Sequence, residues 1–401
     1  MLRSVLLASA LGALTMGAAH AQTAVKVGVL GDRSGVYTDI SGEGSVVAAR
    51  LAVEDFAKID PSVKVEVVSA DHQNKPDVGA AIARQWYDRD GVDVIVDGVT
   101  SSVALAVNQV TREKNKVLID SGAGTADLTG PQCTPNTVHW VYDTVALANG
   151  TGGAMVKRGG DTWFFLTADY VFGQTLQRDT AAVVTKNGGK VVGSVKTPFP
   201  TADFSSFLLQ AQGSGAKVIG LANAGGDTIN AIKQAGEFGI TGGGQALAGL
   251  LVFSSEVHAL GTKVAQGLVL TEPFYWDLND GTRAFSERFS QQMKGRKPTA
   301  NHAGVYAGTI HYLKAVAALK GEAKDGAKVV AKMKDMPTDD PLFGKGTIRA
   351  DGRKIHDMYL FEVKKPAESK GEWDLYKTLA TIPGNEVFRP LGEGGCPLVK
   401  G

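Results

Sequence analysis

Hydroxyl and amide groups gather in three short segments, and each segment follows a run of apolar residues. The segments read Val96-Asp97-Gly98-Val99-Thr100-Ser101-Ser102, Ile119-Asp120-Ser121-Gly122-Ala123-Gly124-Thr125 and Ala222-Asn223-Ala224-Gly225-Gly226-Asp227. Each apolar run predicts a strand, and the polar residues after it predict a helix start. The free N–H groups and positive dipole end of a helix start suit a carboxylate. Ordinary helix capping is the alternative for each segment, but two hydroxyl-rich segments on neighbouring strands favour a binding site.

Aromatic side chains are expected to form the walls of such a site. Tyr37 follows the first predicted strand, Tyr170 and Phe172 follow the strand over 162–166, and Tyr306 begins a later helix. Core packing is the alternative for Phe172. A Tyr side chain is less readily buried unless its hydroxyl finds a partner.

Motifs for catalysis, cofactors and metals are missing from the sequence. It contains no G-x-x-x-x-G-K-[ST] phosphate loop, and Gly28, Gly31 and Gly35 do not form G-x-G-x-x-G. It has no G-x-S-x-G nucleophile elbow and no H-E-x-x-H metal motif. We therefore predict neither an enzyme nor a cofactor or metal site.

The elements that must position these residues alternate between strand and helix. Apolar runs over 25–30, 63–68, 92–96 and 117–119 predict strands, with amphipathic helices between them. The same pattern begins again at 162–166 and continues to 267–270. Alternation of this kind predicts parallel sheets joined by right-handed crossovers. We expect an α/β protein with two similar lobes.

The N-terminus and the cysteines indicate an exported protein. Residues 1–21 combine Arg3, an apolar stretch and an Ala19-His20-Ala21 site, as in a signal peptide cleaved after Ala21. The apolar stretch is too short for a membrane-spanning helix. Cys133 and Cys396 are the only cysteines, and in an exported chain they predict a disulfide. With 42 basic and 41 acidic residues, the balanced charge argues against nucleic acid as a partner.

The chain resembles the periplasmic leucine/isoleucine/valine-binding proteins, the type I substrate-binding proteins of ABC importers. The segments that carry the resemblance include "VDVIVDGVTSSVALAVNQV", "VLIDSGAGTADLT" and "FFLTADYVFGQTL", in the family's order. The resemblance implies two Rossmann-like lobes with parallel sheets joined by three crossovers. It places residues 24–145 and 272–334 in lobe one and residues 146–271 and 336–364 in lobe two. Residues 365–401 are expected to form an irregular C-terminal extension.

The resemblance also implies a role for each matching residue. Ser101, Ala123 and Thr125 would hold a ligand carboxylate, with Ser102 beside them. Tyr170 or Phe172 would close over the ligand, and Asn223 and Ala224 occupy the second-lobe loop. The expected protein is a periplasmic monomer that passes its solute to an inner-membrane ABC permease.

One departure from the family bears on the ligand. Amino-acid members use an acidic residue after a lobe-two strand to hold the ligand ammonium, and Leu250 or Leu251 stands there in this chain. A buried ammonium without a counter-charge is unfavourable. We therefore predict a keto, hydroxy, aliphatic or aromatic acid as the ligand. Asp227 or Glu256 could substitute for the missing acid, so a branched-chain or other amino acid stays open. A ligand sensor for a signalling partner is a further alternative.

Overall fold

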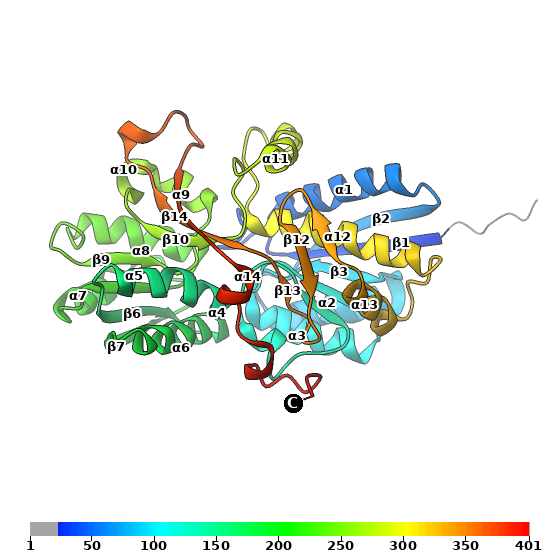
Figure 1. Cartoon of the computed structure of the whole chain (residues 1–401), viewed down its shortest axis with the longest axis horizontal. Coiled ribbons are helices and arrows are strands. Elements are labelled where there is room, and N and C mark those ends of the chain that lie inside the picture. The colour runs from blue at the N-terminus through cyan, green and yellow to red at the C-terminus, as the bar shows by residue number, and fades with distance from the viewer. Residues whose placement is uncertain (1–22, 401) are drawn as a thin grey trace, which may run out of the picture.

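The computed structural model of the protein describes residues 23–400. The predicted signal peptide, residues 1–21, and its cleavage after Ala21 lie outside the described residues. From residue 23 onward the chain forms two α/β lobes side by side, each built on its own sheet (Figure 1). Within residues 23–400 there is no helix that is both long and apolar enough to cross a membrane.

Lobe one is built on five parallel strands in the order β2-β1-β3-β4-β5. The strands are β1 (Thr23–Gly31), β2 (Val63–Asp71), β3 (Val94–Asp97), β4 (Val117–Asp120) and β5 (Thr137–His139). The helices are α1 (Gly42–Ile59), α2 (Pro76–Gln85), α3 (Ser101–Glu113), α11 (Asp280–Gln292), α12 (Ala300–Ala318) and α13 (Gly326–Asp335). Strands β3 and β4 are buried along their whole length, because helices cover both faces of the sheet.

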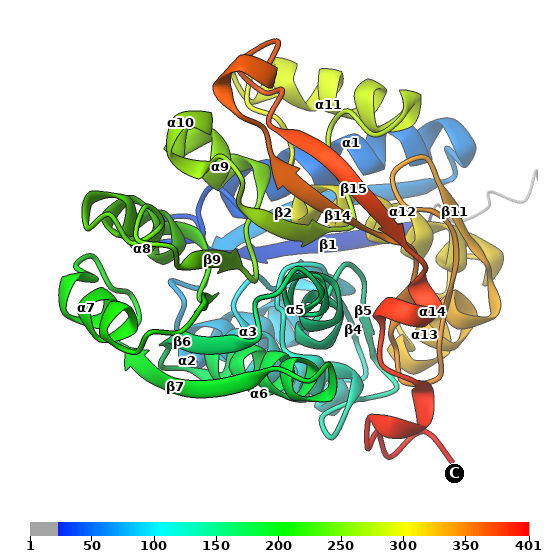
Figure 2. The same ribbon diagram turned by 60° about the vertical axis from the view of Figure 1, so that its left-hand side comes forward.

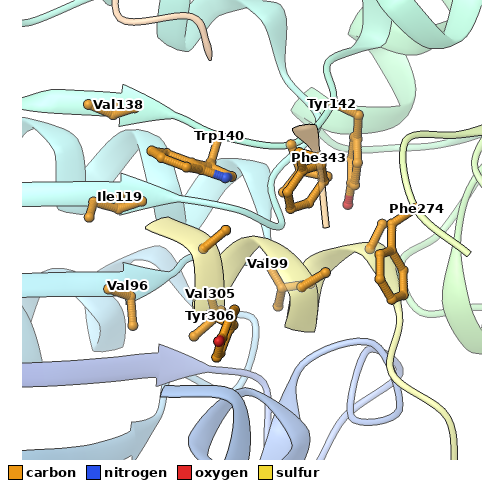
Figure 3. Packing of buried hydrophobic residues seen from close by; sticks show 14 of the residues in the cluster. Val96, Val99, Ile119, Val138, Trp140, Tyr142, Phe274, Val305, Tyr306 and Phe343 are labelled. Carbon is orange, nitrogen blue, oxygen red and sulfur yellow. The ribbon is translucent and has the colours of Figure 1, made fainter. Parts of the chain in front are cut away.

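Helix α12 lies in the core of lobe one. Figure 3 shows Val96, Ile119 and Val138, from three neighbouring strands, on the same side of the sheet as Val305 of α12. A Cβ atom at Gly308 would come within 2.7 Å of Ile119 Cγ2, so glycine lets the helix approach the sheet closely. A helix that is apolar on all sides belongs in such an interior position.

Lobe two is built on seven strands in the order β15-β14-β10-β9-β8-β6-β7. The strands are β6 (Thr162–Ala168), β7 (Lys190–Thr197), β8 (Val218–Ala222), β9 (Ala246–Gly249), β10 (Val269–Glu272), β14 (Met358–Val363) and β15 (Tyr376–Ile382). The helices are α5 (Gly153–Lys157), α6 (Val171–Lys186), α7 (Ser205–Gly213), α8 (Gly225–Glu237), α9 (Ser254–Leu260) and α10 (Thr262–Ala265). Strands β14 and β15 run antiparallel to their neighbours, and the other five strands are parallel.

Three crossovers join the lobes, which confirms the predicted fold class. The chain enters lobe two through α4 (Thr144–Leu147), returns to lobe one after β10, and crosses again before β14. Short 3-10 or π turns are η1 (Trp86–Asp90), η2 (Ala126–Thr129), η3 (Ala148–Gly152), η4 (Pro366–Glu368) and η5 (Leu391–Glu393).

The third crossover comes later in the chain than we expected. Residues after 336 first form a small antiparallel sheet of β11 (Thr338–Asp340), β12 (Gly344–Ile348) and β13 (Lys354–Ile355). This sheet lies beside lobe one, because His139 N at the end of β5 donates to Gly352 O at 2.9 Å. Assigning the first part of 336–364 to lobe two was therefore wrong.

The C-terminal segment is more regular than its composition suggested. The prediction of an irregular extension over 365–401 was wrong for β15, which extends the lobe-two sheet, and for α14 (Gly384–Val387) (Figure 2). The predicted disulfide is confirmed: Cys133 and Cys396 are bonded, with Cα atoms 5.6 Å apart. It ties the end of the chain to lobe one.

Candidate ligand-binding site

A small cavity lies between the two lobes. Its lining comes from both lobes and from the first crossover: Tyr37, Ile40, Val99, Gly122, Gly124, Tyr142, Tyr170, Phe172, Ala224, Leu251 and Phe253. Most of these residues follow the carboxyl ends of parallel strands, where ligands bind in α/β proteins. A larger depression lies near Lys217 and Val269, at the opposite edge of the lobe-two sheet, and contains none of the predicted site residues.

The lobes touch directly beside this cavity. The hydroxyls of Tyr37 and Tyr170 share a 2.6 Å hydrogen bond across the interface. The ring of Phe199 stacks on Tyr170 with centroids 4.4 Å apart. A backbone bond from Gly226 N to Val36 O, 3.1 Å long, joins the lobes at the same place. The structure therefore shows the closed form of the clamp.

On the lobe-one side, the structure brings Ser101 and Thr125 together. Thr125 N donates to Ser101 Oγ at 3.2 Å, and both residues are buried. The Thr100 side chain, at the N-cap of α3, makes no capping bond to the first turn and donates to Asn74 Oδ1 instead. Val99, two residues before α3, lines the cavity. An uncapped helix start therefore faces the lobe interface here.

Ala123 is held differently from Thr125. Its N–H donates to Asp120 Oδ1 at 3.0 Å, and its carbonyl lies 2.7 Å from His139 Nε2. Burial raises the pKa of Asp120 well above its usual range. The glycines on either side of Ala123, Gly122 and Gly124, form the cavity wall in its place. Ser102 is half-buried in the first turn of α3 and does not line the cavity.

The glycine between Ala123 and Thr125 was not among the predicted site residues. A Cβ atom at Gly124 would come within 2.7 Å of Phe172 Cε2 on the opposite lobe. The loop from lobe one and the ring from lobe two can therefore meet in the closed form only because this position lacks a side chain.

On the lobe-two side, Tyr170 and Phe172 mark a second uncapped helix start. Tyr170 is the N-cap of α6, and its side chain makes no bond to the first turn. Both aromatic residues line the cavity. The start of α6 thus reaches the cavity from the side opposite α3.

The start of α8 differs, because a carboxylate of the protein already occupies it. Glu256 is buried and accepts bonds from Gly225 N at 2.9 Å and from Phe253 N at 2.8 Å. Burial raises the pKa of Glu256 to about 7. These bonds commit Glu256 to the first residues of α8 and to the N-cap of α9, so it is not available as a counter-charge for a ligand.

The remaining predicted positions in lobe two are Asn223, Ala224, Leu250 and Leu251. Ala224 and Leu251 line the cavity, whereas the Asn223 side chain accepts a bond from Thr228 Oγ1 at 2.7 Å and is not in the lining. Leu250 is fully buried. Leu250 and Leu251, one of which the resemblance places where amino-acid binders would have an acid, are thus both aliphatic.

Asp227 is the remaining predicted acid near the interface, and it does not line the cavity. One carboxylate oxygen accepts a bond from Thr201 N at 3.0 Å, and the other has no partner among residues 23–400. Burial raises the pKa of Asp227 to about 6. Its charge also contributes to the raised pKa of Tyr37.

The sequence did not predict where three aromatic residues lie. Tyr306 is not at the cavity: its hydroxyl donates to Asp55 Oδ2 at 2.7 Å, and its ring packs on Phe285. Tyr142 and Phe253 line the cavity with rings 5.7 Å apart, although neither was predicted. Tyr142 lies in the first crossover, so its place depends on how the lobes meet.

Across residues 23–400 there is no cluster of His, Cys, Asp and Glu arranged to hold a metal ion.

The chain belongs to the periplasmic binding protein family, whose family model matches residues 24–372. A solved periplasmic binding protein from Burkholderia mallei is 53% identical, with a TM-score of 0.91, over 94% of this chain and 100% of that chain. A branched-chain amino acid ABC transporter periplasmic ligand-binding protein from Burkholderia xenovorans is 41% identical, with a TM-score of 0.83, over 93% and 99%.

More distant relatives are also similar to this chain over most of its length. The Leu/Ile/Val-binding protein homolog 6 of Brucella melitensis is 26% identical over 91% of this chain and 94% of its own length. A solute-binding protein of an ABC transporter from Rhodopseudomonas palustris, in complex with 4-hydroxybenzoate, is 23% identical with a TM-score of 0.81, over 90% and 97%. That similarity shows the shared fold. The family and its solved members are substrate-binding proteins of ABC transporters rather than enzymes.

Proposed function

We propose that this protein binds a small carboxylic acid without an α-amino group and delivers it to an ABC permease. The observation that carries the proposal is the pair of uncapped helix starts, α3 and α6, on opposite sides of one cavity. Each offers backbone N–H donors and the positive end of a helix dipole, which together stabilise a carboxylate. Ser101 and Thr125 hold the lobe-one loop through their hydroxyls but do not line the cavity.

The apolar part of the cavity wall favours an apolar or aromatic ligand body. Leu251, Phe253, Phe172 and Tyr142 supply aliphatic and aromatic surface. An acid such as a benzoate or a branched keto acid would bury its apolar part against these rings, and burial contributes about 25 cal/mol per Å². The 4-hydroxybenzoate complex of the Rhodopseudomonas relative agrees with such a ligand.

An amino-acid ligand is the alternative, and Asp227 is the observation in its favour. Its partnerless oxygen could accept a bond from an ammonium. The names of the Burkholderia xenovorans and Brucella relatives also refer to branched-chain amino acids. Against this, the resemblance implies that Leu250 or Leu251 stands where amino-acid binders use an acid, and Glu256 is already committed to Gly225 and Phe253. We therefore favour the acid without an amine.

Lobe closure would link binding to delivery. A ligand in the cavity bridges α3 and α6, and the Tyr37–Tyr170 bond forms only when the lobes meet. A permease that contacts both lobes would bind the closed form better than the open form, as for other clamps of this kind. The export signal over residues 1–21, with cleavage after Ala21, belongs to the same proposal and would place the protein in the periplasm. A sensor would use the same closure, and the genes next to its own would distinguish sensing from transport.

The proposal is tested by identifying what the protein carries when it is purified. The full chain is exported from a bacterial host, purified without added ligand and denatured, and the released small molecules are identified by mass spectrometry. We expect a molecule with a carboxylate and no amine. Release of leucine or another amino acid as the main species would contradict the proposal.

A further inference from the structure

The last part of the chain leaves lobe two and ends on lobe one. We call residues 383–396, which follow β15, the C-terminal strap. Near its start, Gly384 N donates to Asp357 Oδ1 at 3.0 Å, and Val387 O accepts a bond from Asn149 Nδ2 at 2.8 Å. At its end, Cys396 is bonded to Cys133. The strap is therefore fixed on lobe two by β15 and on lobe one by the disulfide.

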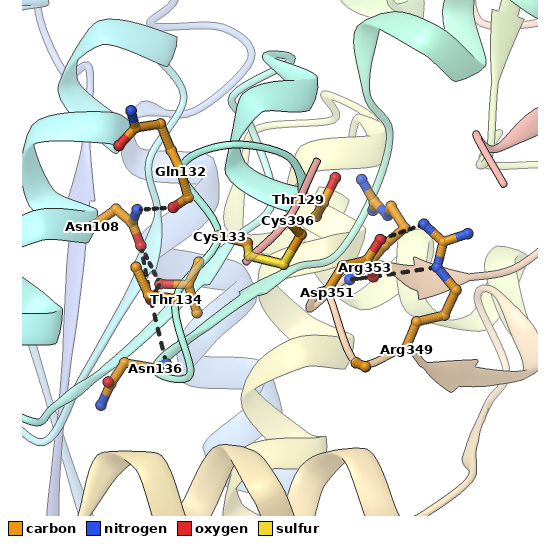
Figure 4. Close-up of a disulfide and its surroundings, with 12 residues drawn as sticks. Asn108, Thr129, Gln132, Cys133, Thr134, Asn136, Arg349, Asp351, Arg353 and Cys396 are labelled. Carbon is orange, nitrogen blue, oxygen red and sulfur yellow. Dashed lines mark hydrogen bonds and ion pairs between the residues drawn. A yellow bond between two sulfur atoms is a disulfide. The ribbon is translucent and has the colours of Figure 1, made fainter. Parts of the chain in front are cut away.

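The middle of the strap holds a loop of lobe one through Arg389. Arg389 Nη2 donates to Ala126 O at 3.2 Å and to Thr129 O at 3.4 Å, the first and last residues of the turn η2. The carbonyl of Arg389 accepts a 2.7 Å bond from Arg349 Nη1. Arg349 is itself held by an ion pair with Asp351 at 2.6 Å (Figure 4). The strap thus connects the small sheet beside lobe one to η2.

Turn η2 continues the loop that forms the cavity wall. Thr125 caps η2, because its hydroxyl accepts a bond from Asp127 N at 3.3 Å. Gly124 O accepts a bond from Thr144 N at 2.8 Å, and Ala126 N donates to Thr144 Oγ1 at 3.3 Å. Arg389 therefore acts on the same short stretch of backbone as the groups that face the ligand.

The strap and η2 are also in close contact without side chains between them. A Cβ atom at Gly130 would come within 2.9 Å of Gly394 O, and one at Gly394 within 3.1 Å of Thr129 O. Phe388 is buried, with the Arg353 guanidinium 4.8 Å above its ring. The strap is thus packed in place along its length, rather than attached only by its disulfide.

We propose that the C-terminal strap positions the ligand loop Gly122–Thr129, with Arg389 as the positioning residue and Cys133–Cys396 as the anchor. The inference rests on the proposed function only in that this loop is the lobe-one wall of the ligand cavity. Oxidising conditions outside the cytoplasm keep the anchor closed. Reduction of the anchor would free the end of the strap and loosen the loop.

A simpler role for the disulfide is global stabilisation of the folded chain by restricting the unfolded chain. The two roles differ in where backbone amides become exposed. Loss of global stability speeds hydrogen exchange in both lobes alike, whereas loss of positioning speeds it locally.

Hydrogen exchange of the full-length mature chain, without ligand, separates the two roles. In Arg389→Met, which keeps the side-chain length but removes the donors, we expect amides of 125–132 to exchange about tenfold faster, because charged hydrogen bonds to two carbonyls are lost. Exchange over β8 to β10 should stay unchanged. In Arg389→Lys, which keeps one charged donor group, the increase should be smaller. Rates in 125–132 within twofold of the wild type in Arg389→Met would overturn the proposal.

The double variant Cys133→Ser/Cys396→Ser tests the anchor independently. We expect the same segment to exchange faster, ahead of the rest of the chain. A uniform increase over both lobes would instead indicate global stabilisation and would overturn the role of the anchor. Arg296→Met is the matched control, because it breaks an exposed ion pair with Asp39 in lobe one, at 2.8 Å, that lies away from the strap.

These measurements need no ligand, so their failure is distinct from failure of the proposed function. If the released acid is identified, its dissociation from Arg389→Met should be about tenfold faster than from the wild type. An unchanged dissociation rate would contradict the positioning role even if ligand release confirmed the proposed function.

Discussion

The starts of α8 and α3 face the same lobe interface, but only the start of α8 has a protein side chain as the acceptor for its N–H group. At α8 the protein supplies its own carboxylate, because Glu256 accepts bonds from Gly225 N and Phe253 N. At α3 the N-cap residue Thr100 makes no capping bond, and its side chain turns to Asn74. The N-cap of α6, Tyr170, is also uncapped.

The difference separates the start of α8, which the protein fills with its own carboxylate, from the starts of α3 and α6, which have no side-chain cap. Buried N–H groups require an acceptor, so a helix start inside a protein is satisfied by a side chain, by water or by a ligand. Glu256 shows that this chain uses a carboxylate for the purpose where no ligand is needed. A ligand carboxylate would do the same at the cavity, between α3 and α6.

We expect the largest effect on stability when the carboxylate at the start of α8 is removed. In Glu256→Ala, Gly225 N and Phe253 N lose their acceptor, and the free energy of unfolding at pH 7 should fall by about 3 kcal/mol. Glu256→Gln keeps one acceptor oxygen and should lose less. Urea unfolding measures both variants. A loss below about 1 kcal/mol in the alanine variant would mean that α8 does not depend on Glu256.

The next effect concerns the place where the two lobes meet. In Gly124→Ala, the added methyl group meets Phe172, which lies 2.7 Å from the ideal Cβ position. The affinity for the released acid should fall about 30-fold, or about 2 kcal/mol, because the closed form is strained. Melting of the ligand-free protein should change little. Phe172→Leu in the same chain should recover part of the affinity, and calorimetry that shows no recovery would contradict the closure model.

The pH dependence of stability provides a third comparison. Burial raises the pKa of Glu256 from 4.5 to about 7 in the folded protein. A carboxyl with a raised folded pKa costs no stability below the unfolded pKa, and its penalty grows as the pH rises towards the folded pKa. Glu256 should therefore lower the free energy of unfolding by about 2 kcal/mol between pH 5 and pH 7.

The contribution of Glu256 must be separated from that of other buried acids. Burial also raises the pKa of Asp97, Asp120 and Asp227, so these groups change stability in the same direction. The difference between the wild type and Glu256→Gln, measured by urea unfolding at each pH, isolates the one residue. A difference that stays constant from pH 5 to pH 7 would show that Glu256 does not titrate in this window.

The smallest effect is expected at the interlobe tyrosines. Tyr170→Phe removes the 2.6 Å bond to Tyr37 but keeps the ring that stacks on Phe199. The affinity for the released acid should fall about fivefold, or about 1 kcal/mol. Tyr306→Phe is the control, because its bond to Asp55 lies within lobe one. Equal losses in the two variants would show that the effect is not specific to closure.

Contacts between neighbouring strands could be predicted from the sequence. Ser101 and Thr125 follow β3 and β4, which are adjacent and parallel, so their loops had to meet. Tyr170 and Phe172 were predicted for the same reason, from the end of β6. Each of these residues is positioned by its own lobe.

The parts that the sequence did not predict depend on contacts between distant segments. Tyr142 and Phe253 line the cavity only because the crossover and lobe two come together. Tyr306 faces α1 rather than the cavity. Because α12 is apolar on all sides, its sequence does not indicate which residues face the cavity. Strand β15 precedes a segment rich in Pro and Gly and is stabilised by pairing with β14, not by its own pattern.

The central claim is that the cavity takes a carboxylate and has no place for an ammonium. Titration calorimetry with leucine and with its keto analogue, 4-methyl-2-oxopentanoate, tests it most directly, because the two share the carboxylate and the side chain and differ only at C2, where a ketone replaces the ammonium-bearing carbon. We predict that the keto acid binds at least tenfold more tightly, a difference of about 1.4 kcal/mol. Tighter binding of leucine, lost in Asp227→Asn, would contradict the claim and identify Asp227 as the counter-charge.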